Sequence, residues 1–177
     1  MKSSHPSSTL WRYFAGLAEY VFQAKLGVAD PPLVDYVSCL LMRFVRSDAM
    51  HRVRNPTGQQ LTEVAEMLVE ANARIGIARR DVHRHIGDFT LFWAGVYPEM
   101  LRGMQTPEKK DHFIDYCSQG KRAYLIASSI ETDDAQDAPA EILERLSFDF
   151  DLCAYGLREV RREWERRDGE TPQMLLH

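Results

Sequence analysis

Cysteine is scarce in this chain, and its few cysteines do not form a recognisable motif. The 177 residues contain three, Cys39, Cys117 and Cys153, and no two of them have the Cys-x-x-Cys spacing. A disulfide framework and the standard zinc and redox motifs are therefore not expected. Unpaired cysteine is often buried as a small hydrophobic residue, so we expect three buried free thiols.

Long apolar runs and an excess of basic residues are also missing. No apolar run is long enough to cross a membrane, and the Ser-rich N-terminus does not read as a secretory signal. The net charge of -4 and the pI near 5.9 argue against a nucleic-acid-binding protein. We therefore expect a cytoplasmic protein that acts on neither membranes nor nucleic acids.

Recognisable catalytic signatures are absent as well. The scattered glycines form no phosphate-binding loop, and there is no Gly-x-Ser-x-Gly turn and no Glu-x-x-His pair. Asp48 and His51 form an Asp-x-x-His step, which resembles one half of a carboxylate-bridged metal site. The sequence names neither a reaction nor a cofactor, and it leaves open whether the protein is an enzyme.

The sequence does contain a strong helical pattern. Hydrophobic residues make up 45% of the chain and charged residues 27%, as in ordinary globular proteins. Apolar residues recur every three or four positions, and no alternating strand pattern appears. We therefore predict an all-α fold, a single-domain irregular bundle of about six helices at 9–168, between flexible tails at 1–8 and 169–177.

Caps and breakers set the expected helix boundaries. Asp30 and Pro31 mark a helix start, because the aspartate caps free N–H groups and proline at the first helical position loses none. Thr106 and Pro107 repeat that signal, and Gly27 is a stop. The predicted helices are 10–26, 31–45, 61–75 (starting at Thr57 or Thr62), 77–96, 107–129 and 138–167.

The last predicted helix has the most regular apolar seam. Steps of four and three residues align its apolar side chains on one face, which could be part of the protein's own core or a surface that a partner completes. The seam consists of Leu146, Phe150, Cys153, Leu157, Val160 and Trp164.

The segment 83–100 places two histidines and an aspartate directly before a run of aromatic residues. On a helix, His85, Asp88 and Phe89 share a face that is expected to point inward, whereas His83 points away from it and is expected to point outward. The His-x-His pair is therefore not expected to chelate one metal ion. If the protein has a pocket, we predict that its ligand-binding residues are His85, Asp88, Phe89 and Trp93.

The structural interpretation of the same segment is simpler. His85 would then be a core histidine, and Asp81, Arg84 and Asp88 would form ion pairs along the helix. Glycine in the middle of a helix often marks a close approach of another backbone, so Gly87 and Gly95 predict tight helix packing.

Two functional hypotheses follow. The first is a helical protein that acts by association, either with itself or as an adaptor for another protein. The second is a small-molecule- or metal-dependent helical enzyme whose pocket is lined by the 83–97 helix. In that enzyme His85 would be an acid, base or ligand, Asp88 would orient it, and Phe89 and Trp93 would exclude water.

Overall fold

The structure is a computed structural model that describes residues 8–45, 53–134 and 137–168. Within these ranges every regular element is a helix, and the only β-type pairing is an isolated bridge between Arg54 and Gln60. The all-α prediction is confirmed, with eight α-helices in the described residues in place of about six. Both predicted tails, apart from Ser8, and the Asp48–His51 step lie outside the described residues.

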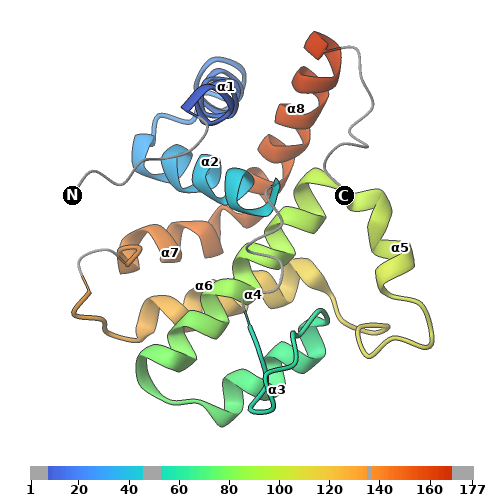
Figure 1. Ribbon diagram of the computed structural model, residues 1–177. Coiled ribbons are helices and arrows are strands. Elements are labelled where there is room, and N and C mark those ends of the chain that lie inside the picture. The colour runs from blue at the N-terminus through green and yellow to red at the C-terminus, as the bar shows by residue number, and fades with distance from the viewer. Residues whose placement is uncertain (1–7, 46–52, 135–136, 169–177) are drawn as a thin grey trace.

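Figure 1 shows the order and arrangement of the helices. A π-helical turn extends the first helix, and a 3-10 turn follows the fourth. In chain order they are α1 Ser8–Glu19, η1 Tyr20–Lys25, α2 Pro31–Val45, α3 Val64–Ala73, α4 Gly76–Val96, η2 Pro98–Met100, α5 Leu101–Met104, α6 Tyr116–Ser129, α7 Ala140–Phe148 and α8 Phe150–Asp168.

Helix α4 is the centre of the fold (Figure 1). It packs against α2, α3, α6 and α8, and all but one of the residues from Val82 to Val96 are buried. A helix covered on several sides cannot show the single apolar stripe of a surface helix. In the structure this segment is the central helix of the core.

Glycine allows α4 and its neighbours to approach closely. A Cβ atom on Gly87 would lie 2.6 Å from the ring of Tyr124 on α6, and one on Gly95 would lie 3.0 Å from Leu157 on α8. Such distances are too short for an added methyl group. The prediction that these small residues mark tight helix packing is confirmed.

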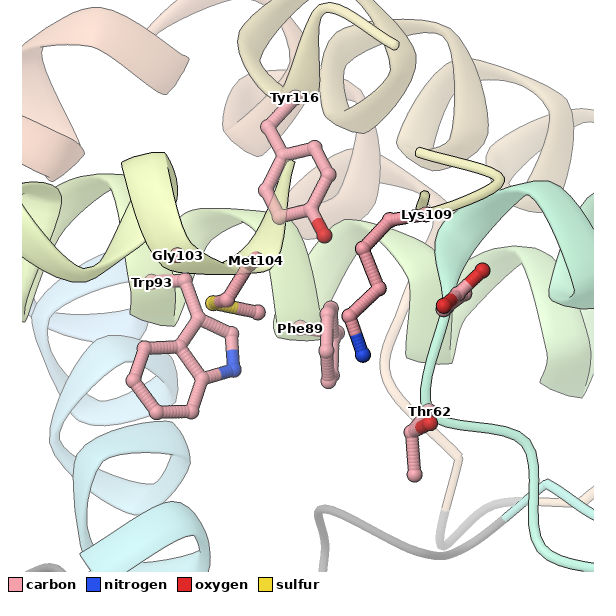
Figure 2. A pocket seen from close by; sticks show the side chains of 8 residues that line it. Thr62, Phe89, Trp93, Gly103, Met104, Lys109 and Tyr116 are labelled. Carbon is pink, nitrogen blue, oxygen red and sulfur yellow. The ribbon is translucent and has the colours of Figure 1, made fainter. Parts of the chain in front are cut away.

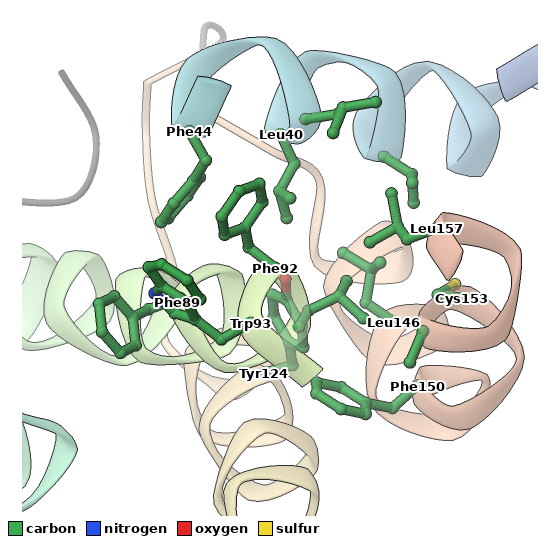
Figure 3. Close-up of a cluster of buried hydrophobic side chains, with 14 of the residues drawn as sticks. Leu40, Phe44, Phe89, Phe92, Trp93, Tyr124, Leu146, Phe150, Cys153 and Leu157 are labelled. Carbon is green, nitrogen blue, oxygen red and sulfur yellow. The ribbon is translucent and has the colours of Figure 1, made fainter. Parts of the chain in front are cut away.

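The predicted last helix is two helices, α7 and α8, which separate at Asp149. This residue leaves the helical region, with φ of -99° and ψ of 21°. The apolar seam continues across the break and lies inside the protein: Leu146, Phe150, Cys153 and Leu157 are fully buried (Figure 3). The seam is thus part of this chain's own core, and no partner is needed to cover it.

The predicted helix at 107–129 begins only at Tyr116, so the start signal at Thr106 and Pro107 was misleading. The cause is Asp111, whose side chain is buried and accepts the backbone N–H of Val64 at 2.8 Å and of Ala65 at 2.7 Å. Asp111 therefore caps α3 from 47 residues away, and Asp115 caps α6 instead.

Helix α3 accordingly starts at Val64, and neither Thr57 nor Thr62 is its cap. Thr57 belongs to a loop in which the side-chain oxygen of Asn55 accepts the backbone N–H groups of Thr57 and Gln59. Asparagine commonly orders turns in this way, which removes the threonine from the helix.

The cysteines are free, as expected, but only Cys153 is buried; Cys117 is half-buried and Cys39 is exposed. The expectation of three buried thiols was wrong because Cys39 lies on the outer face of α2. Among the helices that the structure describes, none has both the length and the apolar character needed to cross a membrane.

We expect Gly87→Ala to destabilise the protein by about 2 kcal/mol through overpacking. The Tyr124 ring cannot yield easily, because it is fully buried and its hydroxyl donates to Asp88 at 2.7 Å. Gly16→Ala is the matched control, since nothing lies within 4 Å of its added Cβ atom. There the better helix propensity of alanine should stabilise by up to about 1 kcal/mol. Urea unfolding gives the free energy of unfolding of both variants. If Gly87→Ala were as stable as Gly16→Ala, the packing argument would be contradicted.

Candidate functional site

The candidate site is a pocket beside α4 (Figure 2). Phe89 and Trp93 come from α4, Met104 from the end of α5, and Tyr116 from the first turn of α6. The cavity measures about 240 Å³. The remaining lining residues are Thr62, Glu63, Gly103 and Lys109.

Three aromatic rings form the wall of this pocket. Phe89 and Trp93 are four residues apart on α4, so they share a face, and their ring centroids are 6.3 Å apart. The Tyr116 ring lies 6.2 Å from that of Phe89. All three are buried in the fold, so the wall is formed before any ligand arrives.

The indole N–H of Trp93 is a polar group of the pocket that lacks a hydrogen-bond acceptor. Its Nε1 atom is buried and has no hydrogen-bond partner in the described part of the chain. Figure 2 shows this nitrogen on the edge of the indole that is turned toward Phe89, another lining residue. Leaving a buried donor unpaired costs about 1–3 kcal/mol, so an acceptor placed there would be favourable.

Tyr116 is held rigidly on the opposite side. Its hydroxyl donates to Asp111 at 2.6 Å, and the same carboxylate caps α3. Burial, together with the hydrogen bond to Asp111 and its charge, raises the pKa of Tyr116 well above the usual value. The phenol therefore stays neutral, and the cap of α3 also fixes one wall of the pocket.

Charged groups of both signs stand at the edge of the pocket. The Lys109 ammonium points toward the cavity in Figure 2. Glu63 also lines the cavity, and one of its oxygens accepts the backbone N–H of Lys110 at 3.0 Å. One cation and one anion balance each other, so the pocket has no net preference for a charged ligand.

Asp88 lies outside the pocket, in a buried network of its own. Its carboxylate accepts the hydroxyls of Tyr36 and Tyr124, each at 2.7 Å, and pairs with Arg43 at 3.1 Å. Arg84 donates to the Tyr36 hydroxyl at 3.0 Å. Burial and the Asp88 charge raise the pKa values of both tyrosines, so the network is one carboxylate with neutral phenols and two guanidinium groups.

The expected ion pairs along α4 are therefore replaced by contacts between helices. Arg84 reaches Tyr36 on α2 and lies 4.0 Å from Asp137, while Asp88 pairs with Arg43 on α2. Because α2 and α6 pack on either side of α4, partners from other helices outcompete neighbours on the same helix. The carboxylate of Asp88 joins α2, α4 and α6.

His85 lies in an aromatic stack. Its ring is 6.1 Å from Phe44 on α2, with an interplanar angle of 16°, and 6.0 Å from Phe89. The imidazole is buried and is not among the residues that line the pocket. Of the four predicted ligand-binding residues, Phe89 and Trp93 line the pocket, whereas His85 and Asp88 do not.

His83 was expected to point outward, and this was wrong. Only 3% of its surface is exposed, because α3 and α6 cover the side of α4 opposite His85. Burial first, and then the charges of Arg79 and Arg122, lower the pKa of His83 to about 4. No three or more His, Cys, Asp or Glu side chains in the described residues are grouped so that they could hold a metal ion.

Sequence reasoning missed Tyr116, Met104 and Lys109. No local signal marks them, because each meets α4 only after the chain has turned back past Val96. Asp111 falls inside the helix that the sequence predicted at 107–129, and no local pattern marked it as the cap of another helix. Its actual partner is the helix that starts at Val64.

We expect Asp88→Asn to lower the free energy of unfolding by about 3 kcal/mol, because two guanidinium groups would lose a buried counter-charge. Asp81→Asn is the matched control, since it removes the same charge from a half-exposed position on the same helix. It should cost less than about 0.5 kcal/mol. Urea titrations give both values, and a small effect at Asp88 would show that the network is dispensable.

The buried His83 makes stability depend on pH. In the unfolded chain its pKa is near 6.5, and in the folded protein about 4, so the unfolded state binds more protons between these values. Stability contributed by the neutral ring is therefore complete above pH 6.5 and is lost as the pH falls toward 4. At pH 4 the free energy of unfolding of the wild-type protein should be lowered by about 3 kcal/mol through His83, and His83→Leu should not show this decrease. Identical pH profiles of unfolding for the two proteins would contradict the assignment.

Comparison with known protein families, with curated proteins and with solved structures finds no match to this chain. No activity can be carried over from a relative.

Proposed function

We propose that this chain binds a small, largely apolar ligand that carries one aromatic ring and one hydrogen-bond acceptor. The site is the pocket formed by Phe89, Trp93, Met104 and Tyr116. The observation that carries the proposal is the buried indole N–H of Trp93, which has no partner in the described residues and faces the cavity.

The size and lining of the pocket define the ligand class. Drug-sized ligands occupy cavities of about 300–1,000 Å³. A cavity of about 240 Å³ fits a smaller molecule, of about one ring with a short substituent. Aromatic rings prefer edge-to-face or offset contacts, which the rings of Phe89 and Tyr116 offer from two sides.

The ligand is proposed to be neutral. Lys109 and Glu63 contribute opposite charges at the edge, and the other lining residues carry none. The acceptor, such as a carbonyl oxygen, would take the hydrogen bond of the Trp93 indole. In this proposal Phe89 and Trp93 contact the ligand, as the sequence predicted. His85 and Asp88 are core residues that do not contact it.

The proposed function is binding, and it includes no chemical step. Association remains a second proposal, favoured by the aromatic side chains of Phe113 and Phe148, which are 92% and 75% exposed. Such side chains are common at protein interfaces. The free cysteines fit a reducing compartment, so we also propose a cytoplasmic location.

The indole N–H can be observed directly by NMR, using acetophenone as the probe. The chain has three tryptophans, so Trp93→Phe identifies the Trp93 signal. We expect acetophenone to shift that signal downfield in a saturable way, and Trp93→Phe to weaken binding about fivefold through the lost hydrogen bond. Ethylbenzene, which lacks the acceptor, should bind both proteins equally.

Trp164→Phe is the matched control, because Trp164 packs on Phe14 at 5.2 Å and does not line the pocket. It should leave acetophenone binding unchanged. An unmoved Trp93 signal, or equal weakening by both substitutions, would refute the proposal. Native mass spectrometry of the freshly purified protein reports a retained ligand and the oligomeric mass in the same spectrum.

A further inference from the structure

A second cavity lies between α3, α4 and α6, nearer the start of α4 than the pocket of Trp93. It measures about 230 Å³ and shares no lining residue with the pocket of Trp93. Its volume is several times that of one water molecule in the liquid, about 30 Å³. The lining residues are Leu68 and Asn72 from α3, Arg79 and His83 from α4, and Gln119, Arg122, Ala123 and Ile126 from α6.

His83 lines this cavity, and its ring nitrogens have unmet hydrogen-bonding capacity. Both ring nitrogens are buried and lack a hydrogen-bond partner in the described residues. Only 3% of the surface of His83 is exposed, so bulk water does not satisfy them. A neutral imidazole has one donor and one acceptor to satisfy. Two unmet polar atoms on one buried side chain point to a polar ligand in the cavity.

The charged residues that line the second cavity are all positive. Arg79 and Arg122 are its charged residues, and no acidic side chain lines the cavity. Within the part of the chain that the structure describes, neither guanidinium pairs with a carboxylate, and Nε of Arg79 is buried without a partner. Arg79 lies one turn before His83 on the same face of α4, and both arginines line the same cavity as His83.

We propose that this cavity is a second binding site, which takes the oxyanion group of a small organic acid. Arg79 and Arg122 would supply the positive charge, and the planar fork of a guanidinium group matches two oxygens of a carboxylate or phosphate. The neutral His83 ring would donate one further hydrogen bond. Leu68 and Ile126 would hold a short apolar tail.

This ligand differs from the one proposed for the first pocket. The first pocket has aromatic walls and balanced charges, whereas the second has two cations, a histidine and two carboxamides. The two sites share no lining residue and can be tested independently, because each has its own reporter, Trp93 or His83.

The experiment is an NMR titration of protein carrying ¹⁵N-labelled histidine, with His83→Gln used to identify the His83 signals. The probes are butyrate, its neutral analogue butyramide, and inorganic phosphate, all at constant ionic strength. We expect butyrate to shift the His83 ring nitrogens in a saturable way, and butyramide to leave them unmoved. The indole signal of Trp93 should not respond to butyrate.

Arg122→Gln should raise the dissociation constant of butyrate at least tenfold, because a charge-assisted contact is lost. Arg122 is exposed, so the variant should keep the wild-type melting temperature; Arg79→Gln provides a second test. Arg12→Gln is the matched control, since it removes the same charge from the exposed face of α1 and should not change the constant.

Tighter binding of butyrate than of phosphate would assign the site to organic carboxylates, and the reverse order to phosphates; either result supports an oxyanion site. The proposal is overturned if the His83 signals respond to neither ion, if butyramide shifts them as butyrate does, or if Arg12→Gln weakens binding as much as Arg122→Gln.

Discussion

A buried carboxylate that must find partners organises this protein. Asp88 lies on the central helix, where an unpaired charge would cost several kcal/mol. Tyr36 and Arg43 reach it from α2, and Tyr124 reaches it from α6. These contacts are possible only while both helices are docked on α4, and Gly87 gives the Tyr124 ring the space to dock.

The two proposed binding sites depend on that arrangement. With α2 and α6 fixed against α4, Trp93 and His83 face different cavities on the same helix. Asp111 adds a second long-range constraint, because it caps α3 and also holds Tyr116 in the first pocket. Polar contacts between distant segments therefore set the shape of both cavities. Figure 3 shows part of the apolar core that α4 shares with α2, α6, α7 and α8.

Part of the site was predictable, and the reason is helical periodicity. Phe89 and Trp93 are four residues apart, so their shared face followed from spacing alone. The same reasoning grouped His85 and Asp88 with them and turned His83 outward, because it assumed that α4 has one buried face. A helix covered on several sides has no outward face for the pattern to reveal, so the positions of these three side chains could not be read from spacing.

The sequence by itself determined that the protein is helical, where α4 lies, and that Gly87 and Gly95 pack closely, because these properties left a signal within a few turns of the chain. The tertiary structure alone decided where α3 and α6 begin, which groups pair with Asp88, and which side chains line each cavity. Those outcomes depend on contacts such as Asp111 with Val64, 47 residues apart. No local pattern encodes a partner at that separation.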